Sequence, residues 1–157
     1  MKKIKILLVL VGALFYFNSC GYTIVKQSEN NFNIVDISTS GIQKINRKIN
    51  SKLVFNSFRE SKNKIQINLD TKKTKTIKEK NIKNEITKYQ ITISSEITYM
   101  VINENKKNTF IISKNGDLNV AKNALQTLNN EKRLTETLSD KIIEDILDRL
   151  NSELNDS

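Results

Sequence analysis

Alternating apolar and polar positions predict two strands in this chain. Residues 64–70 alternate strictly, and residues 89–101 repeat the same pattern over a longer stretch. A period of two places one row of side chains in a core and the other row in solvent, as in a half-buried strand. The β-branched run at 32–37 predicts another strand, which we expect to end at the polar segment 38–41.

A β-hairpin is predicted after the long strand. The polar segment 103–108 provides its turn, and the largely apolar residues 109–113 return along the preceding strand. Asn115-Gly116 is a second turn signal. The segment 71–85, rich in Lys and Thr, has no clear period, so it either extends the preceding strand outward or forms a loop.

Apolar residues spaced by three and four positions predict a first helix over about 41–59. Ser40 and Gln43 have the spacing of a capping box at its start, and Phe55 or Phe58 would close its apolar face. The residues that line this face are Ile42, Ile45, Ile49 and Leu53. The spacing is that of an amphipathic helix with one buried side.

A second helix is predicted over about 119–153, with a break or kink at Asn129-Asn130. Its apolar positions are Ala121, Ala124, Leu125 and Leu128, followed by Leu134, Leu138, Ile142, Ile146 and Leu150. The element order is therefore β-α-β-β-β-α, without the alternation typical of parallel sheets. We predict an α+β fold over residues 32–157, a single domain with two helices packed on one face of a mixed four-stranded sheet.

A short basic segment precedes an apolar run at the N-terminus. Lys2, Lys3 and Lys5 are followed by the apolar residues 6–17. A membrane-spanning helix needs about 20 apolar residues, whereas a shorter run of this kind fits the apolar part of a secretory signal. We therefore predict that residues 1–19 are a signal peptide.

The only cysteine, Cys20, lies directly after this segment. Ser19 is small, as cleavage before a bacterial lipoprotein cysteine requires, whereas Phe17 and Asn18 depart from the usual residues. A lone cysteine forms neither an internal disulfide nor a Cys-rich zinc site. We predict that Cys20 is lipidated and begins a lead-in over residues 20–31, and the absence of Asp after it favours the outer membrane. The alternatives are an ordinary secretory signal and a short anchor with an incidental cysteine.

The composition argues against catalysis. The chain has no His, which removes the usual general base near neutral pH and the commonest metal ligand. Its four glycines form no phosphate-binding loop, and its neighbouring carboxylates fall on a helix face predicted to be solvated. We expect no enzyme activity, no catalytic residue, no metal and no cofactor. Nucleic acid is also not expected, because an export signal separates the chain from it and no aromatic residues interleave with the basic ones.

The net charge of +9 is concentrated in one stretch. Residues 62–88 contain nine Lys and three acidic residues, a balance of +6, and the remainder of the chain after Ser19 is neutral. At a loop that joins two strands, such a cluster suits the phosphate groups of a lipid or glycolipid. The alternative is a solvated lysine-rich loop, because a bias toward Lys, Asn and Ile also raises the positive charge.

Several short segments share a pattern with one family. They are Cys20-Gly21-Tyr22 after the signal, Lys88-Tyr89-Gln90-Ile91-Thr92-Ile93 in the central strand, Phe110 in the following strand, Ala121 and Ala124, and Leu138-Ser139-Asp140-Lys141-Ile142-Ile143 in the closing helix. Together with the order β-α-β-β-β-α, they resemble the LPS-assembly lipoprotein family (LptE, also called RlpB). The resemblance covers most of the chain after the signal.

The resemblance implies a function and a set of partners. Members of the family are lipoproteins of the outer membrane, on its periplasmic side; they plug the β-barrel LptD, help it assemble and bind lipopolysaccharide during its insertion. The implied partners are an LptD-type barrel, lipopolysaccharide and the outer membrane. The candidate lipopolysaccharide-binding residues are Lys72, Lys73, Lys75, Lys80, Lys83, Lys132 and Arg133.

Two other functions stay open. One is a generic periplasmic adaptor lipoprotein of a transport complex, which would bind protein only. The other is an enzyme of unknown type anchored in the inner membrane, which would need a carboxylate or lysine mechanism.

Overall fold

The computed structural model describes residues 31–155 and confirms the predicted order of elements. The elements are β1 (Asn33–Gly41), α2 (Gln43–Asn56), β2 (Lys64–Lys80), β3 (Ile86–Val101), β4 (Lys106–Asn119) and α3 (Ala124–Asn155). The predicted signal peptide and Cys20 lie outside the described residues.

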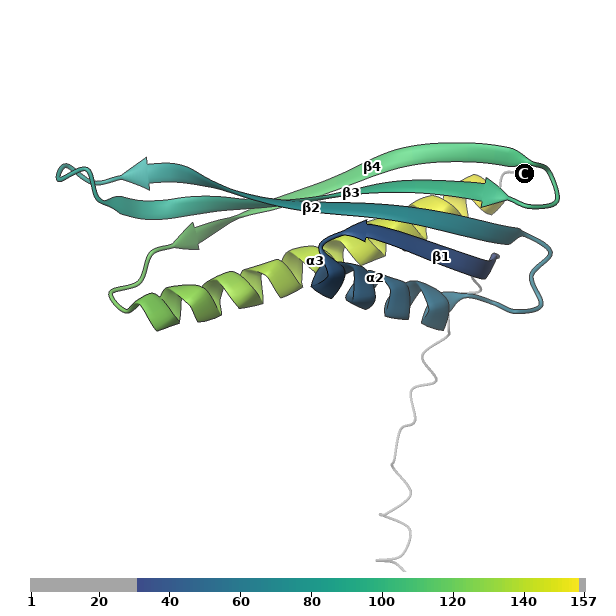
Figure 1. Ribbon diagram of the computed structural model, residues 1–157, viewed down its shortest axis with the longest axis horizontal. Coiled ribbons are helices and arrows are strands. Elements are labelled where there is room, and N and C mark those ends of the chain that lie inside the picture. The colour runs from purple at the N-terminus through teal and green to yellow at the C-terminus, as the bar shows by residue number, and fades with distance from the viewer. Residues whose placement is uncertain (1–30, 156–157) are drawn as a thin grey trace, which may run out of the picture.

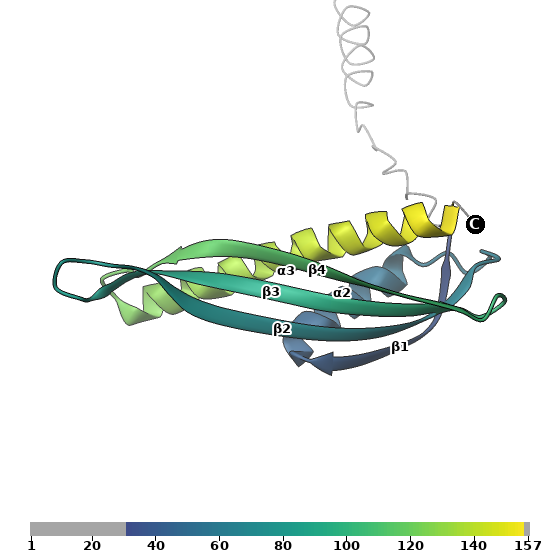
Figure 2. The same cartoon turned by 90° about the horizontal axis from the view of Figure 1, so that it is seen from above.

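The four strands form one mixed sheet in the order β1-β2-β3-β4. β1 runs parallel to β2, and the pairs β2–β3 and β3–β4 are antiparallel. Both helices lie on the same face of this sheet (Figure 1). Seen from above, α3 runs along most of the length of the sheet (Figure 2). The predicted α+β fold is thus confirmed.

The core lies between the helix-facing side of the sheet and the apolar stripes of the two helices. Strict alternation on β3 buries every second residue from Ile91 to Val101, because that face meets α3. The fully buried large side chains are Tyr99, Phe32, Ile49, Leu53, Ile65, Leu69, Ile91, Ile93, Ile97, Ile142, Ile146 and Leu150. The predicted stripe of the first helix therefore supplies the core, and so does the predicted stripe of the second helix from Leu138 to Leu150. Among the earlier apolar positions of that second helix, Leu125 and Leu128 are exposed.

The first strand is longer than predicted, and the predicted capping box is wrong. Ser38 to Gly41 continue β1 because they pair in parallel with residues 68–71 of β2. Ser40 Oγ donates a 2.9 Å hydrogen bond to Asp70 Oδ1 instead of capping the helix. The residue at the helix N-cap is Ile42, which has no side-chain capping bond. Gly41 makes the turn into α2 with φ of 86°, a conformation that favours glycine.

The segment 71–85 extends β2 as far as Lys80 and then turns into β3. The predicted turn at Asn115-Gly116 is wrong, because both residues lie inside β4 and pair with Thr92 and Ile91 of β3. Pairing of β4 along nearly all of β3 overrides this local turn signal.

Both helices differ from their predicted ends. α2 stops at Asn56, and Phe55 does not close its apolar face because it lies about 200° around the helix from Leu53. The predicted break at Asn129-Asn130 is absent, and α3 is continuous from Ala124 to Asn155. Leu125 and Leu128 are exposed because the first turns of α3 extend past the start of α2 (Figure 1).

Candidate ligand-binding surface

Two of the predicted binding lysines converge on one carboxylate of α3. Lys73 and Lys75 point to the helix side of β2, and their Nζ atoms lie 2.6 and 2.7 Å from the two carboxylate oxygens of Glu131. The hydrogen bond from Lys73, and then that from Lys75, hold the pKa of Glu131 below its ordinary value. The Lys75 ammonium also lies 4.3 Å from the centre of the Tyr89 ring. This cluster therefore carries one net positive charge rather than two.

Two other lysines of β2, Lys72 and Lys78, pair with carboxylates outside this cluster. Lys72 points to the open face, where its Nζ lies 3.3 Å from Asp70 Oδ2. The hydrogen bond from Ser40, followed by that from Lys72, lowers the pKa of Asp70. Lys78 pairs with Asp117 of β4 at 2.6 Å. Much of the positive charge of β2 is thus compensated within the fold.

Two further candidates, Lys80 at the end of β2 and Lys83 in the following turn, lie at the tip of the β2–β3 hairpin. Asn81 organises this turn, because its side-chain oxygen accepts hydrogen bonds from the backbone N–H groups of Lys83 and Glu85 at 3.0 and 2.9 Å. Lys80 donates a 3.0 Å hydrogen bond to Asn84, and the tip residue Ile82 is fully exposed. Within residues 31–155, the Lys83 ammonium has no ion-pair partner.

A groove lies between α2, β2 and α3, with a volume of about 400 Å³. Its lining includes the apolar residues Ile42, Ile45 and Leu128 and the basic residues Lys44, Lys73 and Lys132. Glu131 is the only acid in that lining and pairs with Lys73, whereas Lys44 pairs with Glu136 of α3 at 3.7 Å. Within residues 31–155, Lys132 is therefore the lining lysine without an ion pair, which leaves one uncompensated positive charge beside the groove. An apolar interior beside excess positive charge suits an amphiphile with an acyl chain and an anionic headgroup.

The structure therefore brings together only some of the predicted residues. Lys73, Lys75 and Lys132 gather around Glu131 and the groove, whereas Lys80 and Lys83 lie farther out on the hairpin. Arg133 lies beside a different hollow, next to Asp117 and Leu134, and donates a 2.7 Å hydrogen bond to Asn130. The seven candidates form no single site.

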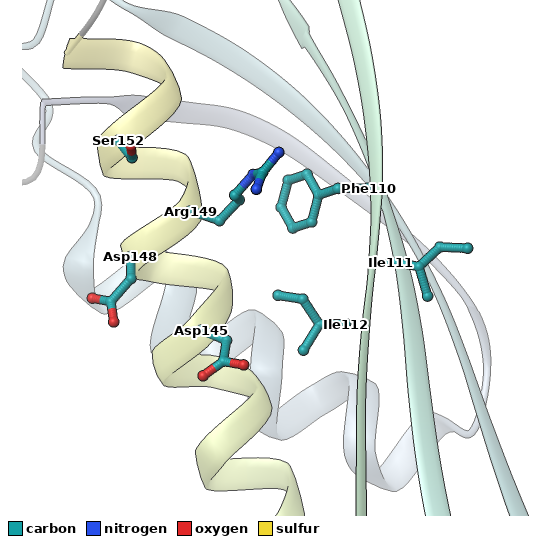
Figure 3. Close-up of a pocket in the computed structure, with 7 residues that line it drawn as sticks. All are labelled: Phe110, Ile111, Ile112, Asp145, Asp148, Arg149 and Ser152. Atoms are coloured by element: carbon teal, nitrogen blue, oxygen red, sulfur yellow. The ribbon is translucent and has the colours of Figure 1, made fainter.

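A further hollow lies between β4 and the C-terminal half of α3, with a volume of about 540 Å³. Arg149 reaches from α3 toward the ring of Phe110, and Ile111 points to the opposite side of β4 (Figure 3). The Arg149 guanidinium lies 5.9 Å from the centre of that ring. None of the predicted binding residues lines this hollow.

Sequence reasoning missed Ile42, Lys44 and Tyr89 as neighbours of the basic cluster. Lys44 lies on α2 and Tyr89 on β3, so only the tertiary packing brings them next to Lys73 and Lys75. One signal in the sequence points to the groove. Leu128 is an apolar residue in the part of α3 before the buried stripe, and it lines the groove while remaining exposed.

Two further features concern the described residues alone. Within residues 31–155 there is no group of three or more metal-binding side chains that could hold an ion. Over the same range, no helix has both the length and the apolar character needed to cross a membrane.

Comparison of the sequence with protein-family models and with curated proteins gives no match. Several solved structures resemble the fold, among them two lipoprotein B structures. Rare lipoprotein B from Shewanella oneidensis has a TM-score of 0.64 at 15% identity, covering 78% of this chain and 98% of that one. An uncharacterized lipoprotein B from Nitrosomonas europaea also has a TM-score of 0.64, at 11% identity, covering 82% and 90%. The fold of this chain is thus similar to that of the lipoprotein B structures over nearly their whole length.

Proposed function

We propose that this chain is a lipoprotein of lipopolysaccharide assembly, held on the periplasmic face of the outer membrane by lipid on Cys20. In this role it occupies the lumen of an LptD-type β-barrel and takes part in lipopolysaccharide insertion. The observation that carries the proposal is the similarity of the fold to rare lipoprotein B, 98% of which is covered. The segments that resemble the LptE family, including Cys20-Gly21-Tyr22, support it independently.

The shape and surface of the domain suit a plug. The sheet is elongated, and no helix of residues 31–155 covers its open face (Figure 1). Hydroxyl and amide groups line parts of that face, as shown by hydrogen bonds between Thr98 and Thr109 at 2.9 Å and between Ser38 and Asn68 at 3.3 Å. A polar face of this kind is compatible with the hydrated interior of a large barrel.

The proposed ligand-binding region is the groove together with the hairpin tip. The groove offers an apolar lining for an acyl chain, and Lys132 beside it has no ion pair within residues 31–155. Lys80 and Lys83 at the tip would meet phosphate groups as point charges. We assign no catalytic step, metal or cofactor to the chain.

A second function is a protein-binding adaptor without a glycolipid ligand. The pairing of Lys73 and Lys75 with Glu131, and of Lys78 with Asp117, favours it, because these lysines are already compensated. The two functions differ in whether the remaining lysines bind lipopolysaccharide.

Lipopolysaccharide binding by the purified protein separates them. Charge reversal at Lys80, Lys83 and Lys132 should weaken binding about tenfold or more, since each lost charge contact contributes on the order of 1 kcal/mol. Reversal of three lysines elsewhere, Lys64, Lys107 and Lys141, is the matched control and should leave binding nearly unchanged. Equal binding by both variants and the parent protein would favour the adaptor.

The lipid anchor has its own test. Replacing Cys20 by Ala should leave an uncleaved and unacylated precursor, because the thiol that carries the lipid is missing. Normal processing of the Cys20→Ala protein would contradict the lipid anchor on Cys20. It would leave the proposed binding to a β-barrel untouched.

A further inference from the structure

A patch of exposed apolar side chains lies at the C-terminal end of α2. Val54, Phe55 and Phe58 are 55%, 70% and 53% exposed, whereas Leu53 beside them is fully buried. Val54 and Phe55 occupy the last turn of α2 away from its buried stripe, and Phe58 follows the helix directly. We call these three residues the Phe55 patch. They are not required to cover the core, and two neighbouring exposed Phe residues are unusual for a surface that faces only water.

The Phe55 patch is surrounded in sequence by basic residues without acidic partners. Arg47, Lys52, Arg59 and Lys62 form no ion pair within residues 31–155, and Glu60 is the only acid between positions 43 and 62. Lys44 and Lys48 on the same helix do pair, with Glu136 and Asp140 of α3. In contrast to the β2 lysines, the positive charge around this patch is therefore uncompensated.

The segment that carries the Phe55 patch is hydrogen-bonded to the first residues of the domain. The Phe58 N–H donates a 2.9 Å hydrogen bond to the carbonyl of Phe32. The side chain of Asn33 donates to the carbonyl of Arg59 at 2.9 Å, and the Ile34 N–H donates to Ser57 Oγ at 2.8 Å. The segment that carries the patch thus lies where the N-terminal chain joins the fold.

The length of the preceding chain limits how far the patch can lie from a lipid on Cys20. Eleven residue steps separate Cys20 from Asn31, and a fully extended chain of that length spans at most about 40 Å. The hairpin tip at Ile82 lies at the opposite end of the elongated domain from the start of β1 and the end of α2 (Figure 1). An anchor at Cys20 therefore limits the distance between the bilayer and the end of the domain that carries the Phe55 patch, and the hairpin tip lies farther from the point of attachment.

We propose that the Phe55 patch binds the surface of an anionic bilayer, with Phe55 and Phe58 at the headgroup boundary and the surrounding Arg and Lys side chains on lipid phosphates. The inference rests on the lipid anchor of the proposed function. Aromatic side chains beside basic ones are the composition of segments that lie on membranes, and basic residues near an anionic surface add electrostatic attraction to it. The contact orients the domain with its hairpin tip away from the lipid.

The test uses the full lipidated chain in vesicles of phosphatidylethanolamine and phosphatidylglycerol, with no barrel present. The chain contains no Trp, so a Phe55→Trp variant carries a single reporter, and Ile82→Trp at the hairpin tip is the matched control. Lipids brominated near the headgroup should quench Phe55→Trp at least about twofold more than Ile82→Trp, with a blue-shifted emission for the former. Equal quenching of the two variants, or none in either, would overturn the proposal.

Charge variants test the role of the basic residues. Lys52→Glu together with Arg59→Glu should remove the quenching of Phe55→Trp, while Lys107→Glu with Lys141→Glu should retain it. Unchanged quenching in the first pair would contradict the phosphate contacts. An unquenched reporter whose emission shifts only when a β-barrel is added would overturn the bilayer contact in favour of a protein one. Flotation of the protein with the vesicles checks the anchor separately: a chain that does not float contradicts the proposed function itself.

Discussion

The hydroxyl of Tyr99 in β3 donates a 2.5 Å hydrogen bond to Glu153 in α3. Asn108 of β4 donates to the same hydroxyl over 2.9 Å, so three elements meet at one phenol. Burial, followed by the bond to Glu153, raises the pKa of Tyr99 to about 12. The phenol therefore remains a protonated donor throughout the physiological pH range, and it ties the C-terminal end of α3 to the sheet.

Removing that hydroxyl should destabilise the domain. Tyr99→Phe keeps the ring, which packs edge-on against Phe110 at 6.2 Å between centroids, but loses the bond to a charged acceptor. We expect a loss of about 2 kcal/mol in the free energy of unfolding, the usual range for hydrogen bonds to charged groups. Urea denaturation measures it. A loss below about 0.5 kcal/mol would show that the hydrogen bond contributes little.

The contact of Glu131 with Lys73 and Lys75 predicts a dependence of stability on pH. Its folded-state pKa is lowered by the two lysine hydrogen bonds, so its contribution is fully present above the unfolded value of about 4.3 and is lost as pH falls through the folded value. Glu131→Gln should be less stable than the parent by about 1 kcal/mol at pH 7, and this difference should shrink below about pH 4. Urea unfolding at several pH values measures the difference. A gap that stays constant down to pH 2 would contradict the assignment.

Gly41 should tolerate no side chain. Its φ is 86°, and a Cβ at this position would lie 2.1 Å from the carbonyl oxygen of Thr71 in the backbone of β2. Gly41→Ala should therefore lower the stability by at least about 2 kcal/mol, through strain at positive φ and displacement of backbone. Ser40→Ala, by comparison, loses only the bond to Asp70 and should cost about 1 kcal/mol or less. Thermal unfolding of the two variants compares them; equal losses would contradict the role of Gly41.

The strands that were predictable are those where one face is buried along their whole length. Ile91, Ile93, Ile97 and Tyr99 alternate with polar residues because α3 covers only one side of β3. The sequence left the outer half of β2 ambiguous because this part has no buried face. Residues 74–80 are all exposed, so apolar and polar residues do not alternate along them. Pairing with β3, not a core, holds that part in the sheet.

The candidate site was less predictable than the fold. The lysine-rich character of β2 was visible in the sequence, but the pairing of Lys73 with Glu131 joins residues 58 positions apart. By contrast, the exposure of Phe55 follows from its position about 200° around α2 from Leu53, whereas the hydrogen bond between Phe58 and Phe32 joins distant parts of the chain and is encoded by no local pattern. The predicted surface counted the β2 lysines as free positive charges. In the structure, acidic residues distant in the sequence pair with several of them.

A substitution of the exposed Leu128 tests ligand binding without a large change in stability. It lines the groove and is 61% exposed, so Leu128→Ser should change the stability by less than about 0.5 kcal/mol. If the groove accepts an acyl chain, the same substitution should weaken lipopolysaccharide binding several-fold, because apolar contact area is lost. Isothermal titration with lipopolysaccharide measures the affinity. Unchanged affinity would remove the groove from the binding region and leave the hairpin tip.

The role in a β-barrel is the central claim, and co-purification from membranes tests it most directly. The full chain, with an affinity tag after Ser157, is extracted from outer membranes of its native host in mild detergent, and the proteins that accompany it are identified and quantified. We predict one large β-barrel protein in about equimolar amount. Recovery of the chain alone, or with partners that include no β-barrel, would contradict the account.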